Sequence, residues 1–180
     1  MALFTRLTPT PTPTPGPETW TPEGTLVSQR YRALERATVL VYTADTHRGT
    51  PSYAAACLGC TYRADRNTSG NVMKETDAAQ AANTHAAACR SMPRGVPTRP
   101  SDTEAAELIR TPLWNRRYSK APRPVHLSDF NRLRVDVQRS TNWIKTLLTG
   151  IAQTEPSFLT ATPTSSGEGT RFTVQPFYRA

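Results

Sequence analysis

The cysteine and histidine residues of this chain have the spacing of metal ligands, which limits the possible folds more than any other feature. Two residues separate Cys57 from Cys60, three separate His85 from Cys89, and 24 lie between the two pairs. Zn²⁺ takes four tetrahedral ligands from thiolate and imidazole groups. A turn eased by Gly59, which can take a positive φ, would bring the first two thiolates together, and one turn of helix would put His85 and Cys89 on the same face. The sequence therefore predicts a structural zinc site with Cys57, Cys60, His85 and Cys89 as its ligands.

Three other interpretations of these residues stay open. Cys57 and Cys60 could form a redox pair, although no thioredoxin-like βαβ pattern surrounds them. The cysteines could be ordinary buried side chains, and their spacing would then be a coincidence. His47 could replace His85 as the fourth ligand, although it lies in a less constrained polar turn. A closed disulfide framework is excluded, because the chain has three cysteines.

Over residues 57–89 the chain resembles the Cys-Cys-His-Cys zinc fingers. Cys57 and Cys60 match the knuckle pair, and His85 and Cys89 match the pair on the helix. The resemblance implies a small module folded around a metal that contacts nucleic acid or protein. The segment between the pairs is about twice the usual length of twelve residues. The flanks, rich in alanine, arginine and Thr-Pro, resemble those of small proteins from actinomycetes or their mobile elements.

We expect an α+β protein with a small zinc-stabilised module in its first half. Residues 1–24 are expected to be a disordered arm, because the Thr-Pro repeats over 8–17 lack amide donors and favour an extended chain. Residues 25–92 form the zinc-binding module. Its expected elements are a helix over 25–36, a β-hairpin of strands 38–44 and 50–56, and a helix over 72–91. One helix over 26–44 is the alternative to the first helix and strand.

The second half is expected to begin with a linker and to end in a βαββ module. Residues 93–124 form a basic linker, with a short helix that runs to Arg110 and begins at a capping box of Ser101 and Glu104. Residues 125–180 form the βαββ module. Its expected elements are a strand over 132–138, a helix over 141–151 and strands over 157–162 and 170–176.

Positive charge is concentrated in the middle of the chain. The net charge is +8, and residues 90–139 hold 11 basic and 5 acidic side chains. Arginine makes bidentate contacts with phosphate, and exposed aromatic rings stack on bases. The candidate nucleic-acid-binding residues are Arg110, Trp114, Arg116, Arg117, Tyr118, Lys120, Arg123, Arg132 and Arg134. Alternatively, the rings anchor the linker on the core and the charges are solvated.

The motifs that are missing also limit the function. The sequence has no phosphate-binding glycine loop, no Gly-x-Ser-x-Gly and no His-Glu-x-x-His, so we expect no enzyme and no small-molecule substrate. No apolar run reaches 18 residues, and the first seven residues lack the apolar core of a secretory signal. We therefore expect a cytoplasmic protein without a membrane partner. The prediction is a zinc-stabilised nucleic-acid-associated accessory or regulatory protein, or alternatively a protein-interaction or assembly component.

Overall fold

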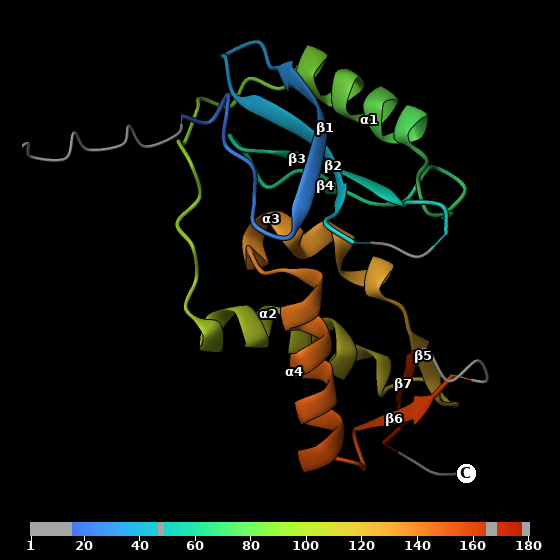
Figure 1. Cartoon of the computed structure of the whole chain (residues 1–180). Coiled ribbons are helices and arrows are strands. Elements are labelled where there is room, and N and C mark those ends of the chain that lie inside the picture. The colour runs from blue at the N-terminus through green and yellow to red at the C-terminus, as the bar shows by residue number, and fades with distance from the viewer. Residues whose placement is uncertain (1–15, 47–48, 165–168, 178–180) are drawn as a thin grey trace, which may run out of the picture.

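The protein is a mixed α+β structure built on two small antiparallel sheets, as its sequence predicts (Figure 1). The computed structural model describes residues 16–46, 49–164 and 169–177. Most of the predicted disordered arm lies outside these residues. Figure 1 shows the first sheet and α1 at one end of the molecule and α2, α4 and the second sheet at the other. The division of the chain into the four expected segments stays a prediction.

The first sheet has four antiparallel strands in sequential order. They are β1 (Thr25–Arg32), β2 (Thr38–Ala44), β3 (Tyr53–Cys57) and β4 (Arg63–Ala64). The prediction of a helix over 25–36 is wrong, because β1 pairs with β2 along its length. A bulge between Val27 and Gln29 interrupts the alternation of side chains. Leu26 and Leu34, whose spacing favoured a helix, are exposed. The strands predicted at 38–44 and 50–56 are confirmed as β2 and β3.

Both faces of the first sheet are covered, and all seven residues of β2 are therefore buried. Helix α1 (Glu75–Ala88), which confirms the predicted helix, covers one face. Its buried residues are Ala78, Ala82 and Ala86, spaced by four so that they form one stripe on the helix. Trp20 and Val135 pack on the other face with Leu40 of β2. The metal ligands on β3 and α1 are thus held by a packed core.

The second half of the chain packs two longer helices and a small sheet around its own core. Its elements are α2 (Asp102–Arg116), β5 (Arg123–Val125), η1 (Leu127–Leu133), α3 (Arg134–Val137), α4 (Thr141–Thr154), β6 (Leu159–Pro163) and β7 (Thr170–Val174). The sheet order is β5-β7-β6. The capping box of Ser101 and Glu104 is confirmed, but α2 continues through Pro112 beyond its predicted end. The helix at 141–151 and the last two strands are confirmed, whereas β5 was not predicted.

The prediction of a strand over 132–138 is wrong, because this segment is helical. Its alternating apolar residues do not lie on one face of a sheet. Val135 packs in the core behind the first sheet, whereas Val137 packs in the core of the second half. Arg134 between them is also buried. A segment between two cores buries residues in several directions, which can mimic the alternation of a strand. The helix ends at Gln138, which has a φ of 48°.

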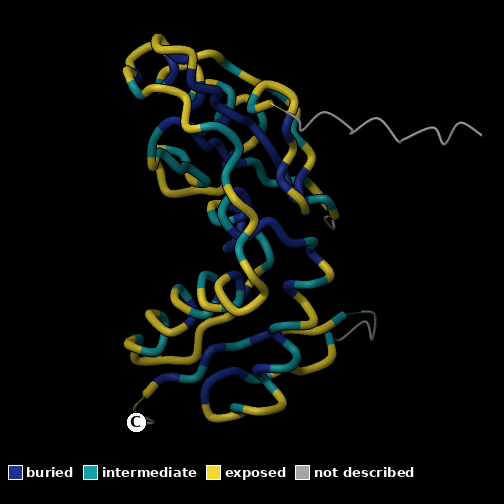
Figure 2. The backbone as a smooth tube through the Cα atoms, turned by 90° about the vertical axis from the view of Figure 1, so that its left-hand side faces the viewer, coloured by how far each residue is buried: buried dark blue, intermediate teal, exposed yellow. Residues whose placement is uncertain are grey.

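The two halves are joined by hydrogen bonds between residues far apart in the sequence. The hydroxyl of Tyr42 donates to the carbonyl of Asn131 at 2.9 Å, and the amide of Thr141 donates to the carboxylate of Asp45 at 3.1 Å. The buried segments in Figure 2 continue across this junction. Among the residues that the structure describes, no helix has the length and apolar character needed to cross a membrane.

Candidate metal centre

The structure brings the four predicted ligands into one group that can hold a metal ion. Cys57 ends β3, Cys60 lies in the turn to β4, His85 lies in the last turn of α1, and Cys89 caps that helix. Their ligand atoms all lie within 4.8 Å of one another, and Cys60 Sγ is 3.4 Å from His85 Nε2. Tetrahedral bonds of about 2.0–2.3 Å place ligand atoms roughly 3.5–4 Å apart. The group needs little adjustment to close around one ion.

The turn that carries the cysteines orients their sulfur atoms through backbone amides. The amide of Gly59 donates to Cys57 Sγ at 3.3 Å, and that of Tyr62 donates to Cys60 Sγ at 3.4 Å. Such bonds fix the direction of ligand atoms and stabilise thiolates. Gly59 does not use its ability to take a positive φ, because its φ lies outside that range. Glycine is needed for space instead: a Cβ there would lie 2.5 Å from that of Ala37.

The helical side of the group is fixed by packing and by a ring stack. The rings of Tyr62 and His85 lie 3.9 Å apart and are nearly parallel, at 8°. The hydroxyl of Tyr62 donates to the carbonyl of Ala81 at 3.3 Å. These contacts hold the imidazole with Nε2 toward Cys60. Cys89 donates its amide to the carbonyl of His85 at 2.8 Å, so both helical ligands belong to one turn.

The surroundings of the ligands set their protonation when no metal is bound. Burial raises the pKa of the Cys57 thiol to about 11. Burial also raises the pKa of Cys89, but hydrogen bonds from Ser91, Cys57 and Cys60 outweigh it and leave that pKa lowered. Burial lowers the pKa of His85, which keeps its imidazole neutral and able to bind a metal. All three cysteines are free thiols.

Arg63 joins the candidate metal centre to the second half of the chain. Its guanidinium donates to the carbonyl oxygens of Cys57 and Tyr62, both at 2.9 Å, and to that of Cys60 at 3.4 Å. It also donates to both carboxylate oxygens of Asp136 in α3, at 2.7 and 3.1 Å. Burial lowers the pKa of Arg63, but Asp136 outweighs that effect and the pKa is raised. Sequence reasoning missed this residue, because nothing local links it to Asp136, 73 positions away.

His47, the alternative fourth ligand, lies outside the described residues. His85 is the histidine that the structure places with the cysteines.

Three of the predicted nucleic-acid-binding arginines are engaged in contacts within the protein, and one of them is buried. Arg134 is 1% exposed and donates to the carbonyl of Gly24 at 3.0 Å, so its guanidinium is not at the surface. Arg110 binds both carboxylate oxygens of Glu155, at 2.7 and 2.5 Å. Arg116 binds Asp129 at 2.8 Å. A single open patch that includes all the predicted arginines is therefore not formed.

Other predicted residues gather at the surface beyond the C-terminal end of α2. We define the aromatic–arginine surface as Trp114, Arg117, Tyr118 and Phe177. The guanidinium carbon of Arg117 lies 4.0 Å from the ring centroid of Phe177 and 4.9 Å from that of Trp114. Tyr118 is 73% exposed, and Trp114 and Phe177 are 37% and 38% exposed. Phe177 was not predicted; its only signal was an aromatic residue shortly after the last strand.

The remaining basic candidates, Lys120, Arg123 and Arg132, are exposed. Lys120 and Arg123 follow the aromatic–arginine surface directly in the chain, and Arg123 begins β5. Two of these three exposed cations, Lys120 and Arg123, therefore lie between the end of α2 and the start of β5.

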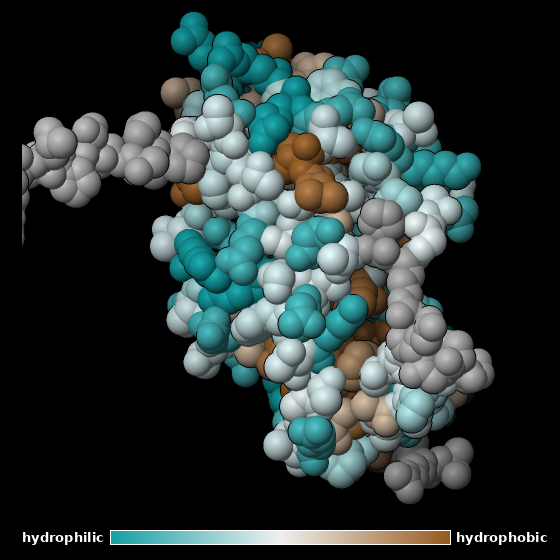
Figure 3. Space-filling model, in the orientation of Figure 1, coloured by the Kyte–Doolittle hydropathy of each residue, from teal (hydrophilic) through white to brown (hydrophobic). Residues whose placement is uncertain are grey.

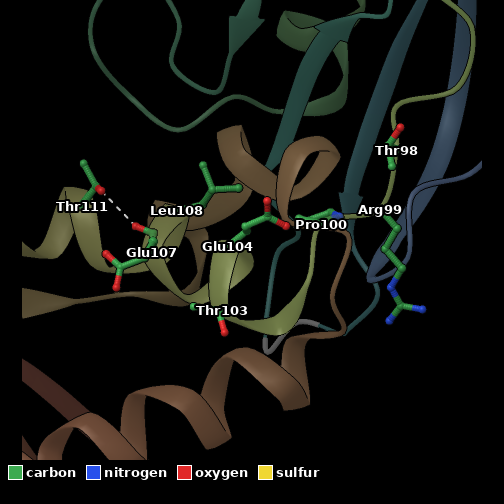
Figure 4. Close-up of a pocket in the computed structure, with 8 residues that line it drawn as sticks. All are labelled: Thr98, Arg99, Pro100, Thr103, Glu104, Glu107, Leu108 and Thr111. Carbon is green, nitrogen blue, oxygen red and sulfur yellow. Dashed lines mark hydrogen bonds between the residues drawn. The ribbon is translucent and has the colours of Figure 1, made fainter.

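A hollow of about 550 Å³ along α2 offers a weaker candidate site (Figure 4). The side chains of Arg99, Glu104 and Glu107 point in different directions in Figure 4 and do not meet at a common point. Glu104 binds Ser101 in the capping box, and Arg99 pairs with Glu23 at 2.6 Å. Glu104 and Arg99 are thus engaged in contacts within the protein.

Comparisons of the chain with protein-family models, with curated proteins and with solved structures found no match.

Proposed function

We propose that this protein is a zinc-stabilised, non-enzymatic accessory protein that contacts single-stranded nucleic acid through the aromatic–arginine surface. The observation that carries the proposal is the Arg117 guanidinium between the exposed rings of Trp114 and Phe177. The exposed ring of Tyr118 packs against Phe177. Bases of any sequence stack on such rings, and nearby cations hold the phosphates. Lys120 and Arg123, which are exposed and follow Tyr118 in the chain, supply the cations.

Zinc is the metal that the ligand set favours. Three thiolates and one imidazole in tetrahedral range are typical of structural zinc sites, which have no open position for a substrate. The ion would fix the turn after β3 to the end of α1. Elemental analysis should find about one zinc per chain. His85→Cys should retain the metal, because four cysteines also bind zinc, whereas Cys60→Ser should lose it.

Nucleic-acid binding can be tested by fluorescence anisotropy with labelled single-stranded DNA and RNA at two salt concentrations. We expect binding that weakens with salt, and a shallower salt dependence for Lys120→Gln and Arg123→Gln. Removal of one stacking ring costs about 1–3 kcal/mol per base. Tyr118→Ala should therefore weaken binding by roughly 5- to 150-fold.

Two further substitutions separate stacking from simple apolar contact. Tyr118→Phe keeps the ring and should bind nearly as well as the parent, whereas Tyr118→Leu keeps apolar bulk without a ring and should bind as weakly as Tyr118→Ala. The absence of binding to either nucleic acid at about 50 mM salt would remove the proposal.

A protein partner is the second candidate function, favoured by a different observation. Arg110, Arg116 and Arg134 are occupied by contacts within the chain, which reduces the charge available to phosphates. Exposed rings and arginines are also enriched at protein interfaces. A surface that buries Tyr118 against a protein would tolerate Tyr118→Leu, so the same variants discriminate between the two functions.

A further inference from the structure

A cleft of about 930 Å³ lies at the junction between the first sheet and the second half of the chain. Its walls come from the β2–β3 hairpin, the segment from β5 to η1, helix α4 and the β6–β7 hairpin. Figure 3 shows apolar surface in this region, on the right-hand side of the molecule. The cleft shares no residue with the candidate metal centre or with the aromatic–arginine surface. Its volume lies at the upper end of the range for small-molecule sites.

The acidic residue that lines the cleft is already occupied. Asp45 accepts hydrogen bonds from the backbone amide and the hydroxyl of Thr141, at the first turn of α4. A carboxylate is favourable at the N-terminus of a helix. The guanidinium of buried Arg134 lies 3.7 Å from the same carboxylate. The negative charge of Asp45 is thus balanced by the protein itself.

The basic residue of the cleft has no such partner. Lys145 lies one helical turn from Thr141 and one turn from Thr149, and all three line the cleft. Lys145 is exposed and forms no ion pair with any residue that the structure describes. The exposed imidazole of His126 also lines the cleft. Among the described residues that line the cleft, the charge left for a ligand is therefore positive.

The rest of the lining combines hydroxyl groups with an apolar wall. Thr50 and Ser128 contribute hydroxyls, and Val125, Leu127 and Phe172 contribute apolar surface. Hydroxyl groups donate to the oxygens of a phosphate, and an apolar wall takes the ring or chain of a ligand. A ligand that uses all of these features carries an anion, polar groups and a body of moderate size.

We propose that this cleft binds a small phosphate monoester with a sugar or nucleoside body. Its phosphate lies at Lys145, and its body lies between the hydroxyls and the wall formed by Val125, Leu127 and Phe172. The inference does not depend on nucleic-acid binding at the aromatic–arginine surface. It adds a small-molecule ligand that no motif in the sequence predicts.

Isothermal titration calorimetry of the full chain tests the proposal with adenosine monophosphate and ribose 5-phosphate as probes, and with adenosine and inorganic phosphate for comparison. Saturable binding of either phosphate monoester supports the proposal. Preference for adenosine monophosphate would assign its base to the apolar wall, whereas equal affinities would assign recognition to the sugar phosphate. The absence of saturable binding of both monoesters at about 1 mM would overturn it.

Variants connect the binding to the cleft. Lys145→Met removes the charge and keeps most of the side-chain length, and it should weaken binding of the monoester by about 10- to 100-fold. Lys74→Met, at the start of α1, is the matched control and should leave that binding unchanged. Tyr118→Ala should also leave it unchanged, so the two proposals can fail separately. Equal binding by the Lys145→Met variant and the parent would refute the assignment.

Discussion

The contacts of Arg63 lead to a quantitative prediction for the stability of the whole protein. Arg63→Gln removes both hydrogen bonds to Asp136 and the donors to the carbonyls around the metal ligands. Loss of one partner of a buried ion pair costs about 3–5 kcal/mol, whereas an exposed pair contributes about 0–1 kcal/mol. The side chains of Arg63 and Asp136 are 13% and 36% exposed. We therefore expect a loss of about 2–3 kcal/mol in the free energy of unfolding.

Thermal unfolding followed by circular dichroism measures this change. For a chain of this length each kcal/mol shifts the Tm by about 2–4 °C, so the Tm of Arg63→Gln should fall by roughly 5–10 °C. Arg66→Gln is the matched control. Arg66 is 42% exposed and lies 3.4 Å from its partner Asp129, so this change should cost less than about 1 kcal/mol.

The loss of stability in Arg63→Gln should also depend on the metal. Arg63 donates to carbonyls of the turn that the metal would hold in place. Chelation should therefore reduce the difference in Tm between Arg63→Gln and the parent. Equal Tm values for the Arg63 and Arg66 variants would show that the contacts of Arg63 do not stabilise the fold. If chelation leaves the fall in Tm of Arg63→Gln unchanged, the contacts of Arg63 stabilise the fold independently of the metal centre.

Three further predictions follow from individual residues. Gly59→Ala would place a Cβ 2.5 Å from that of a neighbouring residue, so it should cost about 1–3 kcal/mol of stability and weaken metal binding. Chemical unfolding would measure the stability, and chelator competition would measure the metal affinity. The control is Gly150→Ala, which lies in open space within α4 and should be neutral or stabilising by up to about 1 kcal/mol. Arg134→Met should lower the free energy of unfolding by about 1–3 kcal/mol, because it removes the buried hydrogen bond to the carbonyl of Gly24 and the positive charge beside Asp45; an unchanged midpoint of chemical unfolding would contradict this. Metal affinity should fall by at least about ten-fold per pH unit as the pH is lowered. The cause is the Cys57 thiol, which has a pKa of about 11 when free of metal and must lose its proton on binding. A competition assay that finds the same metal affinity at pH 8 and pH 6 would refute this.

The sequence predicts the candidate metal centre well because its information is local. The pairs Cys57–Cys60 and His85–Cys89 each lie within one turn, so the spacing within each pair is visible in the sequence, whereas the meeting of the two pairs depends on the packing of α1 on the first sheet. The contact between Arg63 and Asp136 could not be predicted in the same way, since it depends on how two distant segments pack.

The two wrong element predictions have a common physical cause. Leu26 and Leu34, which helped to suggest a helix, are exposed, and β1 is stabilised by its pairing with β2. Over 132–138 the apolar residues divide between two cores instead of covering one face. In both cases tertiary packing decides the conformation, and the order of apolar residues in the sequence does not show that packing.

The long-range hydrogen bonds of the junction also bear on how the chain folds during synthesis. The carbonyl of Gly24 is bonded by Arg134, which is synthesised 110 positions later. The hydroxyl of Tyr42 is bonded to Asn131, which is synthesised 89 positions later. Until those residues leave the ribosome, the face of the first sheet that contains Tyr42 stays open to water, even if the ligands at 57–89 have already taken up a metal. Early metal uptake would therefore give the nascent chain one ordered region before its most distant contacts can form.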